Sequence, residues 1–283
     1  MSQSGAASEV PASSIVDSEV LTPEKAGARF IEGLSKFIDE LPNNDRSFAG
    51  RTLTADFSGG KFRVRHTFHD DGITLTWEVL TGEEAGQNGR VPYKLFALRP
   101  GLALVMMRPL EHESVFLVVD DKRGIGAGIL GRAGLRDSSI AMKRLWGPIL
   151  ESESGVNARA AVSPCDLGGS RFTVAYANGA AIYEHIYLNR HYMTWLGHEG
   201  TSAGVADTER YEAIAIAPFL YLVGWNEKAA PIQISFLFDF EQMLEHAAVL
   251  GVAPGGKPVY GTTTARIVEI SHSRIPELET AKR

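Results

Sequence analysis

The sequence repeats itself at a spacing of 118 residues. Shifting the chain by that distance aligns six sets of residues without a gap: Thr76-Trp77 with Thr194-Trp195, Gly82 with Gly200, Ala85-Gly86 with Ala203-Gly204, Tyr93 with Tyr211, Pro100 with Pro218 and Asp121 with Asp239. A period above about a hundred residues is too long for the unit of a solenoid, whose repeats run to about 50 residues. Each copy should therefore be a body of domain size, and we predict one fold used twice.

Short segments with a two-residue alternation of apolar and polar side chains fill both copies, separated by turn signals such as Gly-Gly, Asp-Gly and Arg-Pro-Gly. In the first copy we expect strands at 51–57, 61–69, 72–80, 93–98, 102–108, 114–120 and 124–130. In the second copy we expect them at 171–177, 181–188, 191–197, 211–216, 220–226, 233–239, 244–250 and 263–270. This spacing predicts a mainly β protein made of two tandem antiparallel β-barrels that arose by internal duplication.

The remaining segments are predicted from composition and periodicity. Residues 1–21 lack apolar periodicity and indicate a disordered tail, as do the polar residues 273–283. Residues 22–41 place apolar side chains at three- and four-residue steps after the helix-starting Thr22-Pro23-Glu24, which predicts an amphipathic helix. The first domain would then span 22–162, including a linker with a short helix at 140–146, and the second barrel 163–272.

Charge and composition exclude several classes of partner. The formal net charge is −6 and no basic cluster exists to neutralise phosphates, so nucleic acid is not expected as a partner. No apolar run approaches the roughly eighteen residues of a membrane-spanning helix, and the N-terminus lacks the features of a secretory signal. Cys165 is the sole cysteine, which favours a reducing compartment. We expect a cytoplasmic protein.

The hairpin turns predict which residues face each other. Asp71-Gly72 is a preferred two-residue turn, and a hairpin built on it pairs His66 with Trp77. The same register, moved by 118 residues, pairs Glu184 with Trp195. Because side chains alternate along a strand, each barrel would hold one titratable group on its apolar inner face, opposite a tryptophan.

These titratable groups are the candidate catalytic residues. A carboxyl group held against an indole should have its pKa raised by desolvation, which would make Glu184 a general acid or base near neutral pH. The alternatives are that Glu184 meets a buried arginine or a backbone donor, or that the register is off by one and the group faces water. His66 is a second candidate and a satisfied core histidine is its alternative. His191, also expected on the inner face, could add a further proton-transfer group.

The opposite face of the second hairpin is rich in polar aromatic side chains, Tyr183, His185 and Tyr187. It is either a ligand-binding face inside a polar lumen or the seam between the two barrels, since tyrosine suits half-wet interfaces. The candidate ligand-binding residues are therefore these three together with Trp77, Trp195, Tyr211 and Trp225.

Metal and cofactor signatures are weak. The eight histidines show no HxH or HxxxH spacing and no CxxC is present, so neither a metal site nor a cofactor is predicted. The glycines of 124–131 resemble a dinucleotide loop, but no helix pattern follows them, and a glycine-rich barrel strand explains them better.

Several spaced motifs carry a family resemblance: YEHIYLN at 183–189, the Tyr-x-Thr-Trp strand at 192–195, Gly-x-Ala-Asp-Thr-Glu at 204–209, Trp-x-Glu-Lys at 225–228, and Asp239. Residues 166–270 thereby resemble the C-terminal domain of the molybdenum cofactor biosynthesis protein F (MoaF) family, and the N-terminal half resembles the other domain of that family more faintly. The resemblance implies a lipocalin-like, or calycin, barrel that binds a small molecule in its mouth. It implies no defined reaction.

Two functions follow as hypotheses. The first is an enzyme, a lyase, isomerase or cyclase without metal or redox cofactor, acting on an apolar or aromatic metabolite in a barrel lumen. The second is a non-catalytic binding or carrier protein for a hydrophobic or pterin-like ligand linked to molybdenum cofactor metabolism. We expect the principal site in the second barrel, which holds the sharper motifs, and unpaired barrel edges could also pair within a homodimer.

Overall fold

The computed structural model describes residues 45–57, 59–134, 139–151, 162–176, 180–253 and 255–272. Within those ranges the chain forms strands, turns and bends without a helix. The predicted helix at 22–41 and the predicted tails at 1–21 and 273–283 lie outside the described residues. The described part accordingly contains no helix with the length and apolarity needed to cross a membrane.

The first barrel is an eight-stranded meander. Its strands are β1 (Thr52–Phe57), β2 (Phe62–Phe68), β3 (Thr74–Thr81), β4 (Asn88–Arg99), β5 (Leu102–Met107), β6 (Glu113–Asp120), β7 (Ile125–Ala133) and β8 (Ile140–Pro148). Each strand pairs antiparallel with the next, and a bridge from Ala55 to Ile149, directly after β8, closes the sheet. The helix predicted at 140–146 was wrong, because this segment is the eighth strand.

The second barrel follows the same plan. It consists of β10 (Arg171–Tyr176), β11 (Ile182–Tyr187), β12 (Tyr192–Glu199), β13 (Ala206–Ala217), β14 (Leu220–Asn226), β15 (Ile232–Asp239), β16 (Leu244–Val252) and β17 (Pro258–His272). Consecutive strands again pair antiparallel, and β17 pairs with β10 to close the barrel. The two-residue strand β9 (Ser163–Pro164) pairs antiparallel with Ile214 and Ala215 near the end of β13. Two tandem antiparallel barrels are therefore the fold, as predicted.

The structural repeat has two spacings. Strands β3, β4 and β5 begin 118 residues before β12, β13 and β14, whereas the pairing of Thr52 with Thr67 recurs 119 residues later as Arg171 with Ile186. The difference arises in the hairpin between β11 and β12. In the first barrel the N–H of His69 bonds the carbonyl of Thr74, but in the second the N–H of Leu188 bonds that of Tyr192, so the second loop is one residue shorter.

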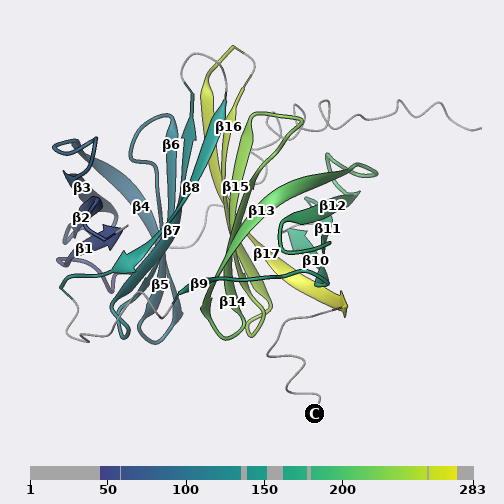
Figure 1. Cartoon of the computed structure of the whole chain (residues 1–283), viewed down its shortest axis with the longest axis horizontal. Coiled ribbons are helices and arrows are strands. Elements are labelled where there is room, and N and C mark those ends of the chain that lie inside the picture. Colours follow the sequence, from purple (N-terminus) through teal and green to yellow (C-terminus); the bar gives the residue numbers. More distant parts are fainter. Residues whose placement is uncertain are drawn as a thin grey trace, which may run out of the picture.

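The two barrels pack side by side (Figure 1). A shared apolar cluster joins them and includes Leu104, Met106 and Phe116 from the first barrel and Ile214 and Leu222 from the second. Every residue of β5 and β15 is buried, because one face of each strand lines its own barrel and the other meets the neighbouring barrel. This seam explains why β5 is continuously apolar, and why β15 buries even its polar residues Gln233, Ser235 and Asp239.

Candidate functional site

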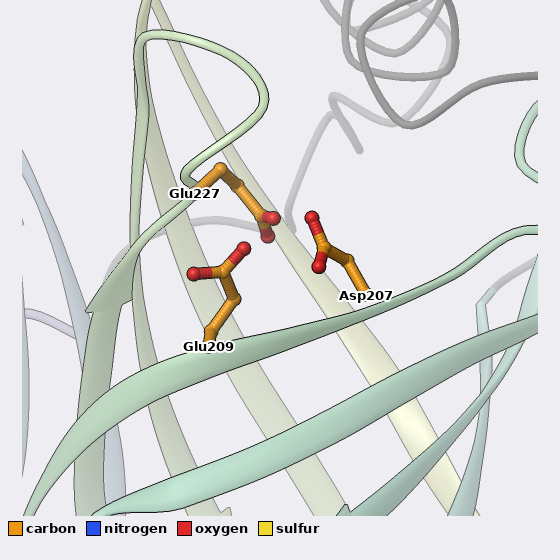
Figure 2. A group of neighbouring side chains, drawn as sticks. All are labelled: Asp207, Glu209 and Glu227. Atoms are coloured by element: carbon orange, nitrogen blue, oxygen red, sulfur yellow. The ribbon is translucent and has the colours of Figure 1, made fainter.

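Three carboxyl groups converge at one end of the second barrel. Asp207 and Glu209 lie two residues apart on β13, so their side chains share the strand face that continues inward to Tyr211. Glu227 directly follows β14, the neighbour of β13. One oxygen from each carboxyl group lies within 4.8 Å of the others, and the three groups point toward one another (Figure 2).

Burial sets the charge of this acidic cluster of Asp207, Glu209 and Glu227. Glu209 is 0% exposed, and its Oε1 accepts the backbone N–H of Lys228 at 3.1 Å. Its buried Oε2 meets no N–H donor among the described residues, and the Glu209 side chain shares a hydrogen bond with Glu227. Burial, reinforced by the charges of Glu227 and Asp207, raises the pKa of Glu209 to about 8. Burial also raises the pKa of Glu227, so one proton is held between the two groups at neutral pH.

Two indoles hold Glu227 in place. The Nε1–H of Trp195 on β12 donates to Glu227 Oε2 at 3.2 Å, and that of Trp225 on β14 donates to Oε1 at 2.8 Å. These hydrogen bonds favour the charged form of Glu227 and oppose the effect of burial on its pKa. The exposed Lys228 reaches Asp207 Oδ1 with its Nζ at 3.4 Å.

A second buried acid lies farther along the lumen. Glu245 of β16 is 0% exposed, and the hydroxyl of Tyr176 donates to its Oε1 at 2.6 Å. Burial raises the pKa of Glu245 to about 8. The ring of Tyr176 contacts Tyr183 at 5.9 Å between centroids, and Tyr183 contacts Trp195 at 6.1 Å. A continuous row of aromatic rings therefore joins Glu245 to the acidic cluster.

The structure places Tyr183, His185 and Tyr187 inside the second barrel, which decides between the two alternatives for this face in favour of the lumen. Tyr187 belongs to the barrel core, and His185 stacks on Phe172 at 5.3 Å between ring centroids. Burial lowers the pKa of His185 to about 3. His185 pairs with Trp195 across β11 and β12, as His66 pairs with Trp77 in the first barrel.

The predicted inner positions of Glu184 and His191 were wrong. The shorter hairpin moves β11 by one residue, so Glu184 pairs with Leu196 and lies on the outer face of the barrel. There its Oε1 binds Nε of Arg171 at 2.5 Å, and this hydrogen bond lowers the pKa of Glu184 instead of raising it. His191 is exposed in the hairpin turn.

Trp195, Tyr211 and Trp225 line the second barrel as expected. The hydroxyl of Tyr211 donates to the carbonyl of Asn189 at 2.9 Å and accepts the N–H of Leu167 at 3.2 Å, so it ties the loop before β10 to the β11–β12 hairpin. These hydrogen bonds give Tyr211 a structural role. Contact between a ligand and Trp195, Tyr211 or Trp225 stays a prediction.

The first barrel carries an apolar cavity of about 60 Å³ at the corresponding end. The predicted pairing of His66 with Trp77 is confirmed, and both line this cavity. Burial lowers the pKa of His66 to about 4. The buried Nε1 of Trp77 has no acceptor among the described residues. Arg132 binds Glu84 at 2.7 Å and Glu113 at 2.5 Å at the rim.

The acidic cluster belongs to the second copy alone. A shift of 118 residues places Gly89, Val91 and Pro109 where the second barrel has Asp207, Glu209 and Glu227. Sequence reasoning did not identify the cluster as a site, although two of the family-like motifs contain its members. The usable signal was the appearance of three acids in one repeat at positions that are uncharged in the other.

The fold and this site define a double-barrel antiparallel β-protein whose second barrel has an acidic, aromatic-walled end. The MoaF N-terminal domain model matches residues 31–134 and the MoaF C-terminal domain model matches residues 162–273. The chain belongs to the MoaF family.

Individual relatives match either over a short stretch or at low sequence identity. A 69-residue stretch is 38% identical to Protein MoaF of Klebsiella aerogenes, and it spans 24% of this chain and 26% of that protein. A provisionally assigned beta-lactamase from Burkholderia vietnamiensis is 18% identical, covers 36% of this chain and 93% of its own, and has a TM-score of 0.32. The DNA polymerase III subunit beta of Pseudomonas aeruginosa is 7% identical over 86% of this chain and 83% of its own, with a TM-score of 0.15. Scores of this size support no structural or functional argument.

Proposed function

We propose that the second barrel binds a small metabolite at its acidic end and catalyses a proton transfer on it, as a lyase or isomerase does. The observation that carries this proposal is the pair of neighbouring carboxyl groups, Glu209 and Glu227, of which one is wholly buried with its pKa raised to about 8. In this proposal Glu209 is the general acid and Glu227 the general base.

The environments of the two groups suit these roles. Two carboxyl groups close together cannot both ionise easily, and the proton stays on the group that is better shielded from water. Glu209 receives a single backbone hydrogen bond, whereas Glu227 receives two indole N–H bonds that favour its negative charge. A ligand between them would meet a donor and an acceptor of protons at neutral pH.

Solvent deuterium exchange tests the chemistry. Native mass spectrometry would first identify molecules that copurify with the full chain. These molecules, and a panel of enolisable aromatic ketones with and without an amino group, would then be incubated with the protein in D₂O and followed by NMR for deuterium at carbon. Glu209→Gln and Glu227→Gln should slow exchange by roughly a hundredfold or more, in line with the usual contribution of general acid–base catalysis.

Glu212→Gln is the matched control, because Glu212 lies on the same strand but pairs outward with Arg144. It should exchange at the wild-type rate. Equal rates in Glu209→Gln and wild type would contradict the proposed acid.

A non-catalytic binding function is the second candidate, and the first-barrel cavity favours it. Its wall is apolar apart from His66, the unpartnered Nε1 of Trp77 and the charged rim. Such a site suits a small apolar group that carries one hydrogen-bond acceptor. If Trp77→Phe weakens the binding of a copurified ligand while Trp195→Phe leaves it unchanged, the first barrel holds that ligand. The reverse result would assign the ligand to the second barrel.

A further inference from the structure

We infer that the acidic cluster recognises the ammonium group of a primary amine, whose apolar or aromatic body lies against Trp195 and Trp225. This inference rests on the proposed function, because it names the ligand class of the same site. It concerns the head group that the site binds and not the reaction that follows.

The cluster has an excess of acidic groups. Asp207, Glu209 and Glu227 meet at one point, and Lys228 supplies the one ion pair that the described residues make with them. The ammonium of Lys228 lies 3.4 Å from Asp207 on a side chain that is 61% exposed. Such an exposed pair contributes little and leaves the interior of the cluster without a positive charge.

A buried oxygen without an N–H donor lies in the cluster. Glu209 is wholly buried, and its Oε2 meets no N–H donor among the described residues, so its side chain relies on the hydrogen bond that it shares with Glu227. Figure 2 shows one carboxyl oxygen of Glu209 turned toward Glu227, with Asp207 facing both groups. An ammonium at this point would donate the hydrogen bonds that the single shared proton otherwise has to supply.

The number and kind of groups favour an ammonium over a metal ion. A primary ammonium has three N–H donors, which three convergent carboxyl groups can accept. Divalent cations such as Ca²⁺ and Mg²⁺ take six or more oxygen ligands, whereas the cluster brings together one oxygen from each of three carboxyl groups. The walls of the site are indole rings, which supply no metal ligand but attract organic cations.

The first barrel offers the contrast. At the equivalent positions it has Gly89, Val91 and Pro109, which carry no charge, and the two acids at its cavity, Glu84 and Glu113, are both paired with Arg132. Recognition of an amine is therefore confined to the second barrel, and one protein should bind one amine.

Calorimetric titration of the full chain tests the inference with defined probes. Benzylamine and n-butylamine would be compared with benzyl alcohol, which replaces the ammonium of benzylamine by a neutral hydroxyl, and with MgCl₂ and CaCl₂. The amines should bind once per chain, and benzyl alcohol should bind at least about tenfold more weakly, since it offers no charge-assisted hydrogen bond to the carboxyl groups. Binding of Mg²⁺ or Ca²⁺ without binding of either amine would overturn the inference, as would equal affinity for alcohol and amine.

Variants locate the site. Asp207→Asn and Glu209→Gln should weaken benzylamine binding by about tenfold or more, whereas Glu212→Gln, with the same change in charge on the outer face of β13, should not. Lys228→Met keeps the backbone N–H that bonds Glu209 and removes the competing ammonium, so it should tighten binding even if the acid variants fold poorly. Unchanged affinity in both Glu209→Gln and Lys228→Met would place the amine elsewhere.

The two proposals can fail separately. Amine binding without deuterium exchange on any ligand would leave the inference standing and contradict the proposed catalysis. Exchange on a neutral ligand, without amine binding, would support the catalysis and contradict the inference.

Discussion

Tyr176 donates its hydroxyl to Glu245 at 2.6 Å inside the second barrel, where Glu245 has no exposed surface. This hydrogen bond favours the charged carboxylate, but burial outweighs it and raises the pKa of Glu245 to about 8. The acid therefore enters the folded state with a proton at neutral pH. The stability of the protein should depend on pH as a consequence.

Glu245→Gln should remove the part of that dependence that Glu245 contributes, while Glu209 and Glu227 keep theirs. The folded pKa lies near 8 and the ordinary value is 4.5, so the contribution of the neutral carboxyl to stability is complete below about pH 4.5 and is lost as the pH rises toward 8. The variant, which is always neutral, should be more stable than wild type at pH 8 by an amount on the order of a few kcal/mol, and similar to it at pH 4.5. Urea unfolding at both values measures this. If the unfolding free energies of wild type and variant changed equally with pH, ionisation of Glu245 would not destabilise the folded protein.

His185→Phe should make the stability of the protein less sensitive to acid. Burial lowers the pKa of His185 from 6.5 to about 3, so its contribution to stability is complete above pH 6.5 and is lost as the pH falls toward 3. The variant keeps the aromatic stack on Phe172 and cannot take up a proton. Its unfolding free energy should fall less than that of wild type between pH 6.5 and 4. The exposed His191→Gln serves as the control and should follow the wild-type profile.

The strands could largely be predicted from sequence, because two-residue alternation and glycine turns are local signals. The segment Ile140–Pro148 was the exception. Leu145 faces the lumen of its own barrel, while Met142 and Trp146 pack against the seam between the barrels, so both faces of β8 carry apolar side chains. The alternation is lost in such a strand, and the remaining apolar spacing resembles that of a helix.

Register could be predicted only where the turn was known. Asp71-Gly72 fixed the pairing of His66 with Trp77 correctly, but the second hairpin lacks that dipeptide and its loop is one residue shorter. A shift of one residue exchanges the two faces of a strand, which moved Glu184 outward and His185 inward. The acidic cluster also depends on the position of Glu227, which directly follows β14. No local sequence pattern predicts that this residue lies beside Asp207 and Glu209.

Trp225→Phe should cost more stability than Trp77→Phe. Both indoles are buried inside equivalent barrels, but Trp225 donates its N–H to Glu227 at 2.8 Å, whereas the N–H of Trp77 has no acceptor among the described residues. The first change leaves a buried carboxylate short of a donor, and the second removes an unpaired donor. The difference between the two losses should be about 1–3 kcal/mol. Equal losses in thermal unfolding would mean that the Trp225 hydrogen bond makes no net contribution.

Arg99→Met tests the seam between the barrels. Arg99, the last residue of β4, binds Asp239 of the second barrel at 2.8 Å, and Asp239 is 1% exposed. Removing the guanidinium leaves a buried carboxylate without its charged partner, which typically destabilises a protein by about 3–5 kcal/mol. Arg65→Met removes an exposed ion pair with Glu78 within the first barrel and should cost less than about 1 kcal/mol. Chemical denaturation of both variants would measure these losses, and a loss in Arg99→Met no larger than that in Arg65→Met would show that the ion pair does not stabilise the seam.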